Sequence, residues 1–191
     1  MPSAVHIGER LRIEGAGAAA GEVAAGSRPL ALVVAEDRYR VLAAGEHTLS
    51  EPDDAPEELL RRSSEERWAI GEVVLRRARP QLVLDLIVYD LDAVPMVELE
   101  GVTRALVALM DELARRKVVT VAMEAIGVAH GGISPAELAE ALELASAAAP
   151  LGLHLLLCDA DSAVVGEVLE HLERRLQPAA DASGDGAAEA G

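Results

Sequence analysis

The chain has 191 residues and 51% of them are hydrophobic, which suits one folded domain with a buried core. Its formal net charge is −16, from 17 basic and 33 acidic residues, and this disfavours binding to nucleic acid and to anionic membranes. Aromatic residues make up only 2% of the chain and Phe is absent, so the stacking platform that single-stranded nucleic acid needs is also missing.

The cysteine content and the hydropathy of the sequence exclude further classes of protein. Cys158 is the only cysteine, which excludes an intramolecular disulfide and a cysteine metal cluster. No stretch is long and apolar enough to span a bilayer, and residues 1–12 lack the basic and apolar runs of a secretion signal. We therefore expect a cytoplasmic protein with no membrane contact, no bound metal and no cofactor.

The first third of the chain gives weak structural signals. A loose apolar alternation at 4–14 predicts an edge strand, and the Gly- and Ala-rich stretch 15–27 predicts a flexible connection. The apolar run 30–35 predicts a buried strand. Three weaker elements follow: a second strand at 39–43, a loop at 45–56 and a helix with a thin apolar face at 57–68.

From residue 71 onward, strands and helices alternate regularly. Short apolar runs predict strands at 71–75, 82–89, 118–123 and 153–158, and apolar residues at helical spacing predict helices at 97–116, 135–148 and 162–176. This order is typical of a three-layer α/β/α fold with a mixed, mostly parallel sheet. We expect a single domain over residues 1–176 and a disordered tail at 177–191, which has no apolar face.

The segment between the strand at 118–123 and the next helix is the most informative. Ser134 is a good N-cap, Pro135 stands at the first helical position, and Glu137 completes a capping box. Glycines precede it at 127, 131 and 132. A Gly-rich turn before a helix N-terminus can hold a phosphate, because free N–H groups and the helix dipole both favour an anion. In the plainer interpretation, the glycines only make the turn and Ser134 only caps the helix.

This segment resembles the macro-domain loop that cradles the diphosphate of ADP-ribose. The resemblance rests on the sequence Ala-Ile-Gly-Val-Ala-His-Gly-Gly-Ile-Ser-Pro at 125–135 and on the order of the elements at 71–176. It implies a macro-domain-like fold and ADP-ribose or a related nucleotide diphosphate as ligand. No Lys or Arg occurs between Lys117 and Arg174, so backbone N–H groups are expected to hold the phosphates.

The ligand loops depart from the family pattern in several places. The family's Gly-Asp pair after the first strand and its Gly-rich loop before the first helix are both missing, and two further departures concern the candidate residues. Where the family has a Thr-Gly pair, this chain has Val128 and Ala129, which removes a hydroxyl donor and adds a Cβ that narrows the approach of a phosphate. Where the family's strand ends in an Asn-Ala-Ala-Asn type motif, the chain has Ala35, Glu36 and Asp37. The resemblance, together with these departures from the family pattern, therefore implies a non-catalytic module. We assign no catalytic residue.

The candidate ligand-binding residues are the loop and one acid at a strand end: Gly127, Val128, Ala129, His130, Gly131, Gly132, Ile133, Ser134 and Asp37. Two other functions remain open. One is a protein-interaction or assembly module that has lost the ligand pocket, and the other is a hydrolase of ADP-ribose derivatives that uses Asp37 or His130. His130 by itself is better explained as a solvent-facing loop histidine.

Three aspartates around the strand at 82–89 form a further candidate. Asp85, Asp90 and Asp92 could bind a metal through hard oxygen ligands, but a loop of turn-forming acids explains them better.

Overall fold

The computed structural model describes residues 3–16, 20, 31–40, 67–77, 81–128, 132–159 and 161–177. Within these ranges the chain forms a seven-stranded sheet in the order β1-β2-β7-β6-β3-β5-β4. The strands are β1 (Ala4–Ile7), β2 (Leu11–Ala16), β3 (Ala31–Asp37), β4 (Val73–Arg77), β5 (Val83–Tyr89), β6 (Thr120–Glu124) and β7 (Leu153–Cys158). The helices are α3 (Leu99–Arg116), α4 (Pro135–Ala145) and α5 (Ser162–Leu176), with a 3-10 turn, η1 (Ser146–Ala148), after α4.

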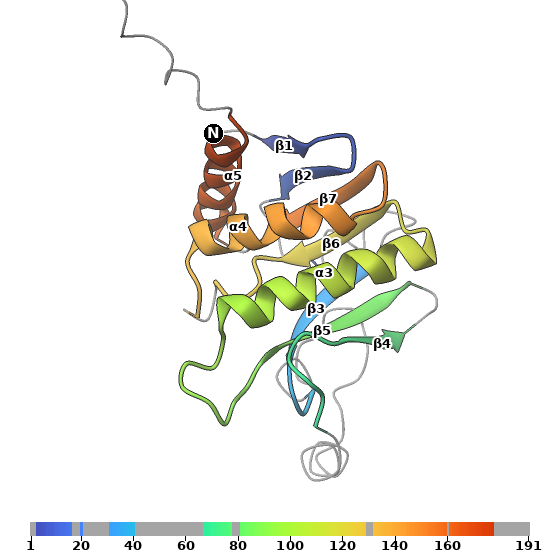
Figure 1. The fold of residues 1–191 in the computed structure, drawn as a ribbon, viewed down its shortest axis with the longest axis vertical. Helices are drawn as coiled ribbons and strands as arrows, with labels where there is room; N and C mark the ends of the chain where they lie inside the picture. Colours follow the sequence, from blue (N-terminus) through green and yellow to red (C-terminus); the bar gives the residue numbers. More distant parts are fainter. Residues whose placement is uncertain are drawn as a thin grey trace, which may run out of the picture.

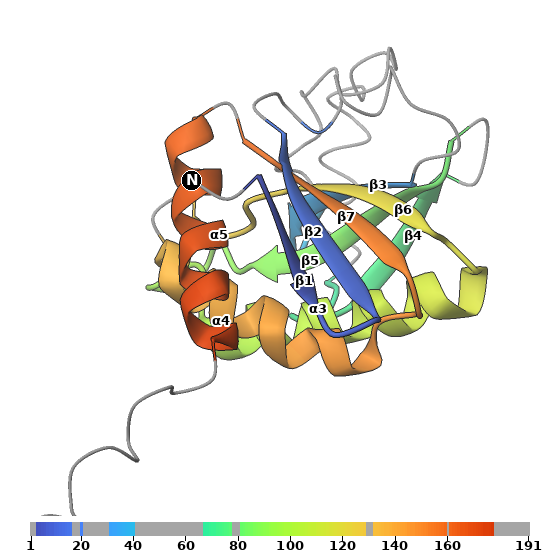
Figure 2. The same ribbon diagram turned by 90° about the horizontal axis from the view of Figure 1, so that it is seen from above.

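The five inner strands are parallel and only the two edge strands are antiparallel, β1 to β2 and β4 to β5. Every residue of β5 is buried, as expected for a strand covered on both faces. The predicted α/β fold with a mixed, mostly parallel sheet is confirmed (Figures 1 and 2).

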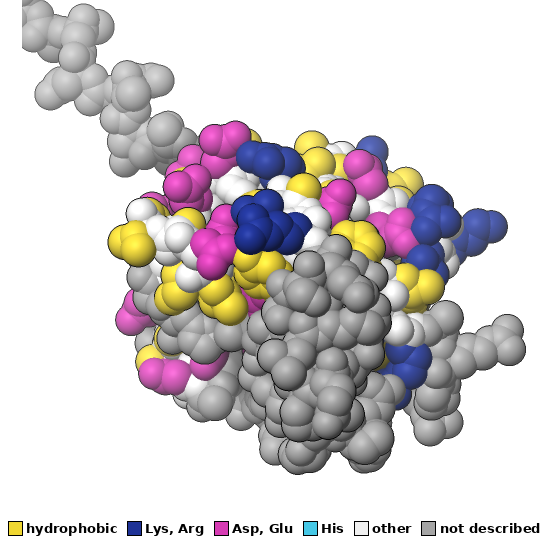
Figure 3. Space-filling view, turned by 90° about the horizontal axis from the view of Figure 1, so that it is seen from below, with side chains coloured by type: hydrophobic (Ala, Val, Ile, Leu, Met, Phe, Trp, Pro, Cys, Tyr) yellow, Lys and Arg dark blue, Asp and Glu magenta, His cyan; other side chains and the backbone are white. Residues whose placement is uncertain are grey.

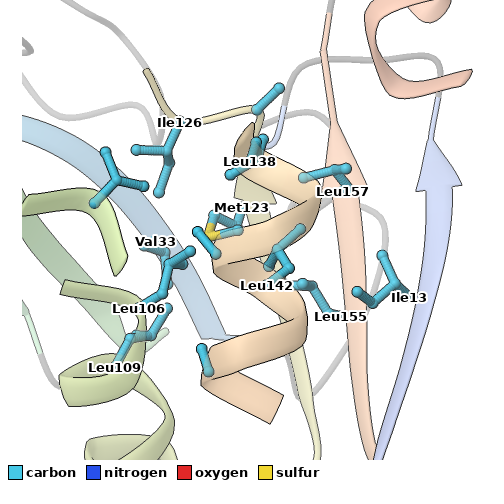
Figure 4. Packing of buried hydrophobic residues seen from close by; sticks show 14 of the residues in the cluster. Ile13, Val33, Leu106, Leu109, Met123, Ile126, Leu138, Leu142, Leu155 and Leu157 are labelled. Atoms are coloured by element: carbon cyan, nitrogen blue, oxygen red, sulfur yellow. The ribbon is translucent and has the colours of Figure 1, made fainter. Parts of the chain in front are cut away.

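The three helices lie side by side on one face of the sheet (Figure 2). α3 covers β5 and β4, α5 covers β2 and β1, and α4 lies between the two helices. The apolar stripe of α3 and the inward side chains of the strands form one large core, which Figure 4 shows around Met123, Leu106 and Leu142. Gly15 in β2 lets α5 approach closely, because a Cβ there would lie 2.8 Å from a methyl group of Val165.

The opposite face of the sheet carries a second, smaller apolar cluster. Leu32, Val34, Val83, Ala122 and Cys158 are buried there. Of the residues outside the sheet, the described part of the chain contributes only Ala20 to this cluster. Residues 57–66 of the helix predicted at 57–68 lie outside the described residues, and its last two residues, Arg67 and Trp68, are not helical. The tail predicted at 177–191 lies outside the described residues from 178 onward.

Two predicted strands differ from the structure. The predicted strand at 4–14 is split into β1 and β2 by a turn in which Gly8 adopts a positive φ of 57°. The predicted strand at 39–43 is wrong at its start, because Tyr39 and Arg40 lie in a turn that closes after β3. The remainder of that strand lies outside the described residues. None of the described helices has the length and apolarity needed to cross a membrane.

Candidate functional site

The five parallel strands all end at the same edge of the sheet, which we call the carboxyl edge. Asp37 ends β3, Tyr89 ends β5, Glu124 ends β6 and Cys158 ends β7. In open α/β sheets, ligands collect at this edge because the strand-to-helix loops converge there. The loop predicted to bind a ligand, between β6 and α4, lies at the carboxyl edge.

That loop begins with a tight turn. Gly127 adopts a φ of 79°, and its carbonyl oxygen accepts hydrogen bonds from the N–H groups of Gly132 and Ile133, at 3.0 and 3.1 Å. Ser134 then caps α4 with the predicted capping box, because its side chain accepts from the Glu137 N–H and the Glu137 carboxylate accepts from the Ser134 N–H. The hydrogen bonds that the Glu137 carboxylate accepts from the N–H and the hydroxyl of Ser134 hold the pKa of Glu137 below its usual range. Ala129, His130 and Gly131 lie outside the described residues.

Most of the described N–H groups of this loop already donate hydrogen bonds to acceptors within the chain. Val128 donates to the carbonyl of Ala125 at 3.1 Å, and Gly132 and Ile133 donate to Gly127. The N–H of Ser134 donates to the Glu137 carboxylate at 2.7 Å. The sequence predicted that such groups would hold a phosphate, but four of them have partners within the chain. The capacity of the described loop to bind an anion is therefore smaller than its sequence indicates.

The two described glycines of the loop have packing roles. A Cβ at Gly132 would lie 2.4 Å from the Cβ of Val97, and a Cβ at Gly127 would lie 3.0 Å from Ile133 and 3.2 Å from Val97. Glycine is needed at both positions because the loop packs directly on the segment before α3. Packing on this segment, together with the positive φ of 79° at Gly127, accounts for both glycines.

Asp37 is fully buried at the end of β3. Its carboxylate accepts the Tyr39 N–H at 2.7 Å, and the Arg40 N–H donates to the Asp37 carbonyl at 3.0 Å. The side chain therefore organises the turn that follows β3. Its neighbour Glu36 is buried as well and pairs with Arg76.

The only three aromatic residues of the chain all lie at the carboxyl edge. Tyr89 ends β5, Tyr39 follows β3, and Trp68 precedes β4, which runs antiparallel and so begins at this edge. The Arg38 N–H donates to the Tyr89 carbonyl at 3.1 Å and the Trp68 N–H to the Arg38 carbonyl at 2.9 Å, which ties the three segments together. In a chain with so few aromatic side chains, this gathering distinguishes the carboxyl edge from the rest of the molecule.

Polar side chains connect the same segments. Arg38 donates to the Asp90 carboxylate at 2.8 Å, which holds the pKa of Asp90 below its usual range, and the Tyr39 hydroxyl donates to Asp92. The guanidinium of Arg67 stacks 5.4 Å from the Tyr39 ring centre. The sequence did not reveal the roles of Arg38, Tyr39 and Arg67. The first two could have been suspected, because they directly follow a buried strand.

A buried ion-pair network lies on the second face of the sheet. The carboxylate of Asp85, which is fully buried, contacts Arg76 at 2.6 Å and Arg40 at 2.7 Å, and Arg76 also pairs with Glu36. Arg40 in turn lies 6.0 Å from the Trp68 ring centre. Every charge in this group is matched by an opposite charge, as buried charges require.

The three aspartates considered as metal ligands each interact with a different partner. Asp85 belongs to the buried network, Asp90 pairs with Arg38, and Asp92 bonds to Tyr39. Asp90 also accepts the Asp92 N–H at 3.1 Å, which is the turn-forming role that the sequence favoured. Among the described residues, no group of three His, Cys, Asp or Glu side chains could hold a metal ion.

The described surface mixes charges with apolar side chains. In the view from below, basic, acidic and hydrophobic side chains alternate, and no large area of one charge is visible (Figure 3).

Similar proteins were found by comparison of structures and not by comparison of sequences. No protein-family model and no curated protein matches the sequence. A macrodomain of Oceanobacillus iheyensis superposes with a TM-score of 0.64 at 15% identity, covering 91% of this chain and 98% of that one. The macrodomain of Thermus aquaticus DarG superposes at 0.59 with 16% identity, covering 78% and 99%. A Trypanosoma brucei macrodomain in complex with ADP-ribose superposes at 0.56 with 11% identity, covering 83% and 68%.

These similarities cover 78–91% of this chain and show the macrodomain fold. The resemblance noted in the sequence between residues 71 and 176 is thereby confirmed at the level of the fold. At identities of 11–16%, the comparisons do not extend to the ligand.

Proposed function

We propose that the chain is a non-catalytic module with the macrodomain fold that binds ADP-ribose or a related nucleotide diphosphate at the carboxyl edge of its sheet. The observation that carries the proposal is the gathering of Tyr39, Trp68 and Tyr89, the only aromatic residues of the chain, at this edge. Structures with the same fold were solved with ADP-ribose and with ADP, which supports the ligand class.

The absence of catalysis is proposed from the end of β3. A general base must reach its substrate with a free acceptor. The Asp37 carboxylate is buried and accepts a hydrogen bond from the Tyr39 N–H, and the Glu36 carboxylate forms an ion pair with Arg76. Neither acid is presented to a ligand, so we assign both to the structure of the strand end.

The proposed affinity is modest. Val128, Gly132, Ile133 and Ser134 already donate within the chain, so these four amides of the loop are not available to a diphosphate. One or two charged hydrogen bonds of about 1.5–3 kcal/mol each and a dipole contribution of about 0.3–2 kcal/mol sum to roughly 2–8 kcal/mol. The upper end of this range corresponds to a Kd of about 1 μM, so we expect binding no tighter than that.

Calorimetric titration with ADP-ribose and ADP tests the proposal. We expect saturable heat with both, and a change in the fluorescence of Trp68, the single tryptophan. If neither nucleotide gives heat or a fluorescence change at millimolar concentration, the ligand proposal fails.

A protein-interaction module is the second candidate function. The observation that favours it is that the four loop amides donate hydrogen bonds to acceptors within the chain. We expect such bonds in a macrodomain fold that no longer binds a diphosphate. Failure of the titration would make this candidate the better account.

A further inference from the structure

A cavity of about 390 Å³ lies between the segment that joins β5 to α3 and the turn before α4. This volume falls within the range of ligand pockets, about 300–1,000 Å³. Most of the residues that line it are apolar: Leu91, Val94, Pro95, Met96, Val97 and Gly132. The cavity therefore suits uncharged, apolar groups, because a polar group placed there would lose its hydration.

The apolar surface continues outside the cavity. The side chain of Val94 is 100% exposed, that of Met96 44% and that of Leu91 41%. We call residues 91–96 the apolar loop. Contiguous exposed apolar side chains commonly mark a surface that contacts another protein or a membrane. A small molecule confined to the cavity would leave the apolar loop in water, whereas a segment of polypeptide can fill the cavity and cover the loop together.

Hydrogen bonds hold the apolar loop in a defined shape, where it projects at the lower left of Figure 1. The Asp90 N–H donates to the Met96 carbonyl at 2.9 Å, and the Ala93 N–H donates to the Asp90 carbonyl at 3.1 Å. The Asp90 carboxylate in turn accepts hydrogen bonds from Arg38 at 2.8 Å and from the Asp92 N–H at 3.1 Å. Because the loop is already ordered, its apolar side chains can be covered at a low entropic cost.

The surroundings of the apolar loop are acidic. Residues 89–100 contain four acidic residues and no basic one. Two of the four pair with arginines, at 2.8 and 3.0 Å. The other two are exposed: Asp92 lies 3.9 Å from Arg67, and Glu98 makes no side-chain capping hydrogen bond at the start of α3.

This charge restricts what can cover the apolar loop. A second copy of the chain would bring another net charge of −16, and an anionic membrane would also be repelled. A polypeptide segment that carries Lys or Arg beside its apolar side chains complements both the apolar surface and the exposed carboxylates.

We propose that the cavity and the apolar loop form a docking site for a segment of a partner protein that carries apolar side chains flanked by Lys or Arg. The apolar side chains lie in the cavity and against Val94 and Met96, and the basic side chains lie beside Asp92 and Glu98. This docking does not require a bound nucleotide, so it goes beyond the proposed function.

Selection from a random peptide library displayed on phage tests the proposal. The library is selected on the wild-type protein, and the enriched peptides are synthesised with a fluorophore and titrated by fluorescence anisotropy. We expect the enriched peptides to share an apolar side chain with Lys or Arg close to it in sequence. Their affinity should fall as the salt concentration rises, because part of the attraction is between charges.

Two variants locate the peptides on the surface. Val94→Ser removes apolar contact area without adding a charge and should weaken binding about fivefold or more. Val94 is fully exposed, so this variant should fold. Glu98→Gln should weaken binding about twofold or more and reduce its dependence on salt.

Each variant has a matched control on another part of the surface. Val119→Ser changes a valine that is 60% exposed just before β6, at the opposite edge of the sheet, and Glu167→Gln changes an exposed carboxylate of α5. Both controls should bind the peptides like the wild type. Circular dichroism of all four variants should match that of the wild type.

Three results would overturn the inference. The first is that no peptide is enriched, or that the enriched peptides share no apolar side chain flanked by basic ones. The second is that Val94→Ser binds the peptides as tightly as the wild type does. The third is that the protein binds phosphatidylcholine vesicles through Val94 and does not bind the peptides, which would assign the apolar loop to a membrane. None of these results bears on the titration with ADP-ribose.

Discussion

Gly132 packs against Val97 so closely that a Cβ at Gly132 would lie 2.4 Å from the Cβ of Val97. This contact joins the turn before α4 to the segment before α3. We expect Gly132→Ala to destabilise the protein by about 1–3 kcal/mol, the range for overpacking a tight core.

Urea unfolding of a double-mutant cycle measures this contact. Because Val97→Gly removes the Cβ and the methyl groups that a new Cβ would meet, Gly132→Ala should cost clearly less in that background. Equal costs in both backgrounds would show that the glycine is required for another reason.

The ion pair between Asp90 and Arg38 makes stability depend on pH. Arg38 lowers the pKa of Asp90 in the folded state, so this stabilisation is present above the usual carboxyl pKa and is lost as the pH falls through the lowered pKa. Asp90→Asn should cost about 0.5–1 kcal/mol at pH 7, a value reduced by the partial exposure of the pair, and close to nothing at pH 2.

Urea unfolding at the two pH values checks this expectation. Glu100→Gln is the control, because Glu100 is highly exposed in its pair with Arg104 and should change little at either pH. A cost for Asp90→Asn that is the same at both pH values would contradict the proposed linkage.

Cys158 should be chemically inert in the folded protein. Burial at the end of β7 raises the pKa of its thiol to about 11, so very little thiolate is present near neutral pH. We expect alkylation by iodoacetamide at pH 8 to be at least roughly a hundredfold slower in the native protein than in urea. Rapid labelling of the native protein would mean that β7 opens at this end.

The purified protein should not release ADP-ribose from ADP-ribosylated protein above the uncatalysed rate. Asp37 is engaged in its own turn, and Asp37→Asn can still accept the Tyr39 N–H, so the variant should fold and behave like the wild type. An active hydrolase assayed alongside provides the positive control. Robust release that Asp37→Asn abolishes would show that this carboxylate is catalytic after all.

The sequence predicted the fold from α3 onward because its signals there are local. The apolar stripe of α3 and the capping box at Ser134 each specify an element without reference to the rest of the chain. The turn after β3 was missed because it depends on one side chain, Asp37, that accepts a backbone N–H two residues later.

The site was less predictable because its interactions are distant in sequence. Nothing local to Gly132 shows that it packs on Val97, and nothing local to Arg38 shows that it pairs with Asp90, 52 residues away. The glycines of the loop suggested ligand approach, whereas packing explains the two that the structure describes.

The most direct test of nucleotide diphosphate binding uses two substitutions at Ser134. Asp and Asn both cap helices as well as Ser, so Ser134→Asp and Ser134→Asn should both preserve α4, while only Asp adds a negative charge where the diphosphate is proposed to lie. In calorimetric titration with ADP-ribose, we expect Ser134→Asp to weaken binding by about fivefold or more and Ser134→Asn to bind like the wild type. Equal binding by the two variants would place the ligand elsewhere and contradict the proposed site.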